Sequence, residues 1–267
     1  SAYRCGVDGA SAIPCATPTT LAALSDGTHT LCVAAANNAV DTSSVVAWGS
    51  PGCTTVKIDT VAPGASLNQP APWLALSGTT LTGSASDPTS GLADVLFQAQ
   101  ASGSSNWINL CNPPIVGTSY SCAVDGSDLS DGVVYKLRLL ATNNAGSSTA
   151  SAIYNSTADL VGPSAPVISS GPADNSWLAQ TSATYSFSAT DPISGVAYYQ
   201  CSSGSFVTCV SPKTFTGLSS GWNNLSFRAV DNAGNVGASS SRAVGSDLID
   251  PLLSLENLPP HISGTVT

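Results

Sequence analysis

The sequence contains few charged side chains and no methionine. Only seven of its 267 residues are Lys or Arg, and Glu256 is its single glutamate. Glu, Lys, Arg and Gln are good helix formers, so their scarcity argues against a helical protein, whereas abundant Val, Thr and Ser favour strands and turns. No apolar run approaches the ~18 residues of a membrane-spanning helix. We therefore expect no membrane insertion within this segment.

Positive charge and histidine are also scarce. The formal net charge is −9, and nucleic-acid binding needs a face of clustered Lys and Arg, so we expect no nucleic-acid partner. The two histidines, His29 and His261, have no recurring nucleophile and carboxylate around them. The sequence therefore predicts a protein that is not an enzyme and has no catalytic residue.

Cysteine, in contrast, is plentiful, and its eight copies fall into four close pairs. An even number of cysteines in local pairs, without Cys-x-x-Cys spacing, favours disulfides and an oxidising compartment. The alternative is free or zinc-bound thiols, which two histidines do little to support. The expected disulfides are Cys5–Cys15, Cys32–Cys53, Cys111–Cys122 and Cys201–Cys209. We expect the first, third and fourth to clamp equivalent hairpins, and the second to join the last two strands of the first domain.

The chain repeats itself. The frame S-A-(S/T)-D-P-x-S-G recurs around Asp87 and Asp191, about 100 residues apart, which is the length of one domain. The opening YRCGVDGASAIPC aligns with YYQCSSGSFVTC, so that Cys5 matches Cys201 and Cys15 matches Cys209. Each copy has a proline-bearing linker, alternating apolar residues and turns rich in Asp, Asn and Gly. This pattern indicates β-sandwiches.

The chain contains the frames ASDxxSGV, YxC…C.SP, LxDGTHTL.V.A and DNAGN, together with D-x-x-x-P linkers. These frames resemble tandem bacterial immunoglobulin-like repeats, which occur in large secreted and surface-attached proteins, including adhesins and fibres. The resemblance covers essentially the whole chain. It implies an all-β linear tandem array of immunoglobulin-like β-sandwich domains at an extracellular or cell-surface location. The expected domains are 1–60, a partial domain without its first strands; 61–160; 161–249; and 250–267, the first strands of a further domain.

The two partial domains lead to an expectation about partners. The tail, PLLSLENLPPHISGTVT, matches the linker, first strand and start of the second strand in APGASLNQPAPWLALSGTTLT, and the opening domain lacks those strands. Either the chain is a window of a longer polypeptide, or the tail of one copy completes the head of its neighbour, as in donor-strand assembly. The join would lack the equivalents of residues 185–196, which favours a continuous parent chain. The expected partners are therefore neighbouring copies or adjoining segments, arranged head to tail.

Calcium is the candidate ligand, because carboxylates recur in the linkers and in the turns at sandwich ends. The ordinary alternative is that Asp and Asn cap turns by bonding their own backbone. Asn143 and Asn144 are the second-domain matches of the later turn in the third domain. The candidate ligands are Asp59, Asp87, Asp159, Asp191, Asp231, Asn235, Asp247 and Asp250.

The sequence thus predicts a structural, non-catalytic segment of an extracellular fibre or cell-surface stalk, with units that continue head to tail and an adhesive role left open. Two alternatives remain. One is a module whose loops at the sandwich ends bind a glycan or protein, which clustered exposed aromatic residues in one set of loops would favour, and the sequence shows no such cluster. The other is an accessory region of a secreted hydrolase. Trp73 and Trp177 recur at matching places and are expected to be structural.

Overall fold

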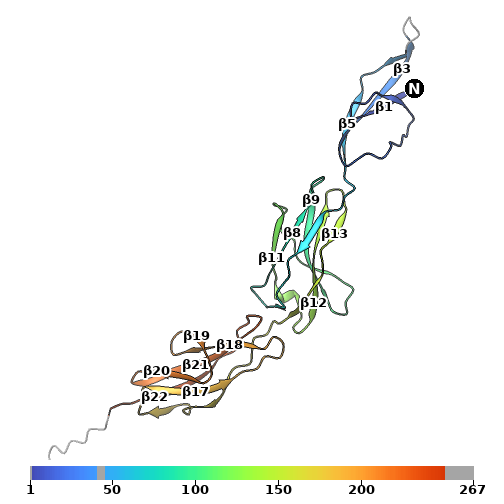
Figure 1. The fold of residues 1–267 in the computed structure, drawn as a ribbon. Helices are drawn as coiled ribbons and strands as arrows, with labels where there is room; N and C mark the ends of the chain where they lie inside the picture. The colour runs from blue at the N-terminus through green and yellow to red at the C-terminus, as the bar shows by residue number, and fades with distance from the viewer. Residues whose placement is uncertain (1, 41–45, 250–267) are drawn as a thin grey trace, which may run out of the picture. The chain divides into compact units, whose positions relative to one another are not determined.

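The computed structural model describes residues 2–40 and 46–249, and these residues form almost only β-strands and turns (Figure 1). Within this part, the single helical element is a 3₁₀ turn, η1 (Gly126–Asp128), whose first turn is capped by the Asp125 carboxylate. No helix in the described ranges is long and apolar enough to cross a membrane. The chain divides into two compact units, Ser1–Leu160 and Val161–Thr267.

The first unit opens with a single five-stranded sheet, which we call the head. Strand β3 lies at its centre and pairs with β1, β4 and β5, while β2 forms the outer strand beside β1. The strands are β1 (Tyr3–Val7), β2 (Ile13–Cys15), β3 (Gly27–Val40), β4 (Val46–Trp48) and β5 (Gly52–Ile58).

The rest of the first unit is a complete sandwich, which we call the second sandwich. Its six-stranded sheet has the order β10-β9-β12-β14-β7, with β13 also paired to β12, and its three-stranded sheet has the order β11-β8-β6. The strands are β6 (Gly64–Leu67), β7 (Trp73–Leu74), β8 (Thr80–Ser86), β9 (Leu92–Ala101), β10 (Ile108–Cys111), β11 (Ser119–Ala123), β12 (Val134–Asn143), β13 (Ser148–Ala150) and β14 (Tyr154–Ala158).

The second unit contains the third sandwich, built in the same way. A three-stranded sheet, β15-β17-β20, faces a five-stranded sheet, β16-β22-β21-β18-β19. The strands are β15 (Val167–Ser170), β16 (Ser176–Leu178), β17 (Ser182–Ser188), β18 (Val196–Ser202), β19 (Val207–Cys209), β20 (Lys213–Thr216), β21 (Gly221–Asp231) and β22 (Ser240–Ser246).

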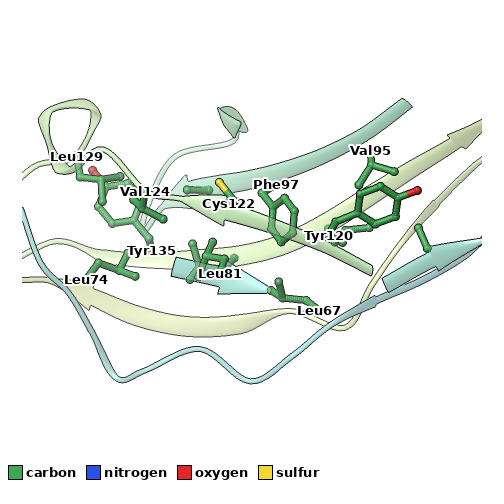
Figure 2. Close-up of a cluster of buried hydrophobic side chains, with 14 of the residues drawn as sticks. Leu67, Leu74, Leu81, Val95, Phe97, Tyr120, Cys122, Val124, Leu129 and Tyr135 are labelled. Atoms are coloured by element: carbon green, nitrogen blue, oxygen red, sulfur yellow. The ribbon is translucent and has the colours of Figure 1, made fainter. Parts of the chain in front are cut away.

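Alternating side chains from the two sheets form each core. In β8 every second residue is buried, beginning at Leu81, because successive side chains of a strand point to opposite faces. In the second sandwich these residues share one core with Phe97 of β9 (Figure 2). Leu139 of β12 belongs to the same core. In the third sandwich the Phe227 ring packs against the rings of Tyr185 and Phe187, at centroid distances of 5.5 and 4.9 Å. The prediction of an all-β protein with immunoglobulin-like sandwiches is therefore confirmed.

Candidate functional site

The head has no counterpart of the smaller sheet among its described residues. Its strands β1, β2 and β3 pair as β18, β19 and β21 do in the third sandwich: Cys5 lies opposite Val33, and Cys201 lies opposite Phe227. Val33 is therefore the equivalent of Phe227. Val33 is 46% exposed, whereas Phe227 is fully buried. The difference arises because β17 covers Phe227, and no described strand covers Val33.

This uncovered face contains a groove of about 470 Å³ that is mostly apolar. The groove lies beside β1 and β2, and its wall includes Cys5, Val7, Ile13, Leu21 and Leu24. Among the described residues of the head, Cys5 and Ala36 are the only apolar side chains that are buried. Among the described residues, the head is therefore a single sheet with one apolar face that no other strand covers.

The loops at one end of the second sandwich bring predicted calcium ligands together. The side-chain amide of Asn143 donates hydrogen bonds to Oδ2 of Asp59 at 3.0 Å, to Oδ2 of Asp87 at 3.2 Å and to the Val61 carbonyl at 3.0 Å. The Asn143 Oδ1 atom accepts from the N–H groups of two residues in its own turn. Asn143 is 1% exposed, so it is a buried clamp between the linker and two loops.

Asp87 is held ionised by this arrangement. Burial raises its pKa, but hydrogen bonds from Asn143 and from the N–H groups of Ser90, Gly91 and Thr89 outweigh burial and leave the pKa below its ordinary value. The linker is also held from the other side, because Oδ1 of Asp26 accepts from both the N–H and the hydroxyl of Thr60 at 2.8 Å. Residues 59 and 60 are thus fixed by side chains on either side of the linker.

The third sandwich has carboxylates at the matching places. Oδ1 of Asp191 accepts three backbone N–H bonds in its turn, as Asp87 does. Asp231 occupies the position of Asn143, and its carboxylate accepts from the N–H groups of Gly234 and Asn235 and from the Asn235 side-chain amide. Oxygen atoms of Asp191 and Asp231 lie within 4.8 Å of one another. This sandwich therefore has two facing carboxylates where the second has a carboxylate and an amide.

The other predicted ligands are placed as follows. Asp159 follows β14, and its N–H donates to the Leu74 carbonyl at 2.9 Å. Asp247 follows β22, and its Oδ1 accepts from the N–H of Ile249 at 3.0 Å. Asp250 lies outside the described residues.

Calcium fits these two places differently. In the second sandwich the Asn143 amide points its hydrogens at both carboxylates, so the position that a cation would take is already filled by a donor. In the third sandwich Asp231 offers an oxygen there, and calcium takes oxygen ligands. Binding of calcium beside Asp191 and Asp231 stays a prediction.

The structure forms four disulfides: Cys5–Cys15, Cys32–Cys53, Cys111–Cys122 and Cys201–Cys209. The first and fourth lie within the β1/β2 and β18/β19 hairpins, and Cys32 lies directly opposite Cys53 in the β3/β5 pair. Cys111–Cys122 differs from the expectation of a hairpin clamp. Cys111 is on β10 of the larger sheet and Cys122 is on β11 of the smaller sheet, so this bond joins the two layers.

His29 has a structural place in the head. Its Nδ1 donates to Oδ2 of Asp8 at 2.6 Å and its Nε2 donates to the Ser25 carbonyl at 2.7 Å. The bond with Asp8, followed by that with Ser25, raises the pKa of His29, since a ring that donates from both nitrogens is protonated. The bond with His29, followed by the Thr30 N–H, lowers the pKa of Asp8.

Two exposed tryptophans form a pair that the sequence did not indicate. Trp177 of β16 and Trp222 of β21 both lie opposite Gly245 of β22, the strand between them. Their ring centroids are 4.8 Å apart, and the two residues are 57% and 52% exposed. The sequence-based expectation concerned aromatic residues clustered in one set of loops, whereas this pair lies on strands β16 and β21. Asn224 lies two residues along β21 on the same face and is also exposed.

A second unpredicted feature is an Arg–Gln–aromatic group on the outer face of each complete sandwich. Arg138 donates to Oε1 of Gln98 at 2.9 Å and lies over the Trp107 ring at 3.8 Å. Arg228 makes the same contacts with Gln200 and Phe206, at 2.7 and 4.0 Å. Matching positions in successive repeats could have revealed these groups, although the aromatic residue lies in a loop of variable length.

Comparisons with known proteins give a limited result. No family model matches the chain, and no curated protein matches it by sequence. Among solved structures, the chain is similar to the fibronectin(III)-like modules of Clostridium thermocellum CbhA. The sequence identity is 11% and the TM-score is 0.40, and the match covers 72% of this chain and 98% of that chain. It is also similar to the FN1–FN3 domains of chicken CNTN1, with 11% identity, 91% of each chain covered, and a TM-score of 0.45. By its own strand order and paired sheets, the chain is a protein of immunoglobulin-like β-sandwiches.

Proposed function

We propose that this chain is a structural, non-catalytic segment of an extracellular fibre or cell-surface stalk, whose units continue head to tail. The observation that carries the proposal is the open, apolar core face of the head. A half-sandwich exposes apolar surface and unpaired strand edges, which are unfavourable in water and favour association. Such a sheet gains stability when a further β-segment completes it.

The bonds inside the chain support a mechanical role. Four disulfides are typical of proteins in oxidising compartments and limit how far a stretched domain can extend. The linker at Asp59 and Thr60 is bonded on both sides, by Asn143 and Ser90 and by Asp26. A linker fixed in this way limits bending at that junction.

Immunogold labelling of intact cells that produce the protein tests this proposal. We expect label on projections or fibres outside the cell, with labelling that survives washing. Label confined to the cell interior would contradict an extracellular structural role.

The exposed tryptophan pair favours a second candidate function, glycan binding. Tryptophan faces bind the apolar faces of sugar rings, and Asn224 offers an amide for hydroxyl groups beside them. Glycan-array binding of the full chain tests this candidate, with Trp177→Ala and Trp222→Ala as variants and Trp107→Ala as the control. We expect a shared loss of about tenfold or more in affinity for both variants and none for the control. Equal binding by all four proteins would exclude the pair as a glycan site.

A further inference from the structure

We propose that the outer face of the larger sheet in the third sandwich binds a short oligosaccharide that carries a carboxylate. A sugar ring lies on the Trp177–Trp222 pair, and the carboxylate lies on Arg228. This inference rests on the second candidate function, glycan binding, and deepens it, because it names the class of sugar and its charged contact. The binding face is defined by the outward side chains of β21 and their neighbours on β16, β18 and β22.

The aromatic end of this face is already in place. A Cβ atom at Gly245 would overlap the six-membered ring of Trp177, so this ring lies directly on the backbone of β22. Trp222 packs beside it, and more than half of each tryptophan is exposed. Because the Trp177 ring is held by the backbone beneath it and the ring beside it, it has little side-chain freedom left to lose on binding. The pair thus offers a preformed apolar surface to a sugar ring.

Polar side chains continue from this pair along β21. Trp222, Asn224, Ser226 and Arg228 alternate with buried residues of the core, so all four lie on the outer face of the sheet. At about 3.3 Å per residue, the row extends about 20 Å from Trp222 to Arg228. It therefore presents, in order, an aromatic ring, an amide, a hydroxyl group and a guanidinium group.

The neighbouring strand leaves the row accessible. The residues of β22 that lie opposite the first three members of the row are Gly245, Ala243 and Ser241. None of these has a side chain long enough to cover β21. A linear ligand can therefore lie along β21 and contact the whole row.

Arg228 forms the other end of the face. Its Nε donates to Oε1 of Gln200 at 2.7 Å, and its guanidinium lies over the Phe206 ring at 4.0 Å. No described residue accepts a hydrogen bond from its two terminal nitrogens. A guanidinium that is held by stacking and has both terminal nitrogens available matches the two oxygens of a carboxylate. Gln200 and Phe206 are thus positioning residues for this contact.

The charge of the face favours an acidic ligand, although the whole chain has a formal net charge of −9. The single acidic residue in the five strands of this sheet is Asp231, which is 2% exposed. An anion near Arg228 therefore meets no exposed carboxylate from these strands. An acidic peptide would also pair with Arg228, but the tryptophan pair, the Asn224 amide and the Ser226 hydroxyl suit the apolar faces and hydroxyl groups of sugars.

The second sandwich provides an internal control. Arg138 is held by Gln98 and Trp107 as Arg228 is held by Gln200 and Phe206. Among the described residues, the second sandwich has no pair of stacked aromatic rings comparable to Trp177 and Trp222. We therefore expect Arg138, without such a pair beside it, to contribute nothing to binding.

Glycan-array binding of the full chain tests the inference with short oligouronates and sialyl oligosaccharides, each also printed as its carboxyl methyl ester. The ester keeps the sugar rings and removes the charge. We expect the unchanged chain to bind the acid about tenfold or more tightly than the ester, because a hydrogen bond to a charged group is the stronger kind. The two sets of acids show whether the carboxylate belongs to a uronic or a sialic acid.

Three variants separate the contacts. Arg228→Gln should remove the preference for the acid and still bind the ester, which also shows that this variant is folded. Trp177→Ala should weaken binding of acid and ester alike, since it removes the surface under the sugar ring. Arg138→Gln, the matched control, should bind as the unchanged chain does.

Equal binding of acid and ester by the unchanged chain would overturn the inference, as would a preference for the acid that survives in Arg228→Gln or disappears in Arg138→Gln. Equal competition by an aspartate-rich peptide would also overturn it, because the face would then recognise charge alone. These results would leave neutral glycan binding at the tryptophan pair standing. The absence of binding to every printed glycan would remove both the inference and the glycan candidate, and would leave the extracellular structural role to immunogold labelling.

Discussion

Asn143→Asp tests the physical account of the linker clamp. The substitution keeps the shape of the side chain and the Oδ1 atom that accepts from the N–H groups of Ala145 and Ser147. It replaces an amide that donates to Asp59, Asp87 and the Val61 carbonyl with an oxygen that faces these same acceptors. A buried carboxylate without a compensating partner typically costs about 3–5 kcal/mol of unfolding free energy.

The loss should depend on pH and on calcium. The carboxyl group that Asn143→Asp introduces would have a raised pKa, since it lies beside two carboxylates, so the folded state would bind more protons than the unfolded state. The deficit should therefore shrink as the pH falls from about 7 toward about 4. Calcium should restore about 2.7 kcal/mol at one hundred times its dissociation constant, because it binds the folded state alone.

Hydrogen exchange measured by mass spectrometry on peptides of β9 and β12 reports the opening free energy of the second sandwich, without assuming that the whole chain unfolds in one step. Asn144→Asp is the control. Asn144 is exposed and its amide donates only to the carbonyls of Ser90 and Leu92, so a loss of about 1 kcal/mol is expected. Equal losses for the two variants, or a loss at Asn143 that ignores both pH and calcium, would refute the reasoning.

Three further predictions follow from the described contacts. The His29–Asp8 pair should stabilise the head most between about pH 4 and 6.5. This stabilisation is lost as rising pH passes the raised pKa of His29, and as falling pH passes the lowered pKa of Asp8. Hydrogen exchange of β1 and β3 peptides, measured against pH, should show this maximum only while His29 is present. Removing the Cys201–Cys209 bond by a double change to Ala should lower the unfolding free energy of the third sandwich by about 2–3 kcal/mol in urea, and an unchanged midpoint would contradict its stabilising role. If calcium binds beside Asp231, chelation should lower the melting temperature of the native chain and leave Asp231→Asn unaffected, whereas no response in the native chain would remove the calcium prediction.

The fold could be predicted because its signals are local and repeated. Alternating apolar residues specify which face of a strand is buried, and the D-P-x-S-G and N-A-G turns mark where strands end. The grouping of Asp59, Asp87 and the later turn was also predictable, because each residue follows or precedes a strand at the same end of the sandwich. The sequence does not show that the Asn143 amide already satisfies both carboxylates.

Other features could not be predicted, because they depend on strand order across two sheets. Cys111 and Cys122 have nearly the spacing of the hairpin pairs, yet the strands that carry them belong to different layers. Trp222 has no counterpart in the other repeats, and its contact with Trp177 requires both strands to flank β22. Spacing along the chain does not reveal such neighbours.

The central proposal is a structural, extracellular role in which the open apolar face of the head associates with a further β-segment. Electron microscopy of the purified full chain at high concentration tests it most directly. The account predicts linear chains of molecules joined end to end, which shorten when Val33→Asp is mixed in. Separate single molecules at every concentration, with a closed and stable head, would contradict it.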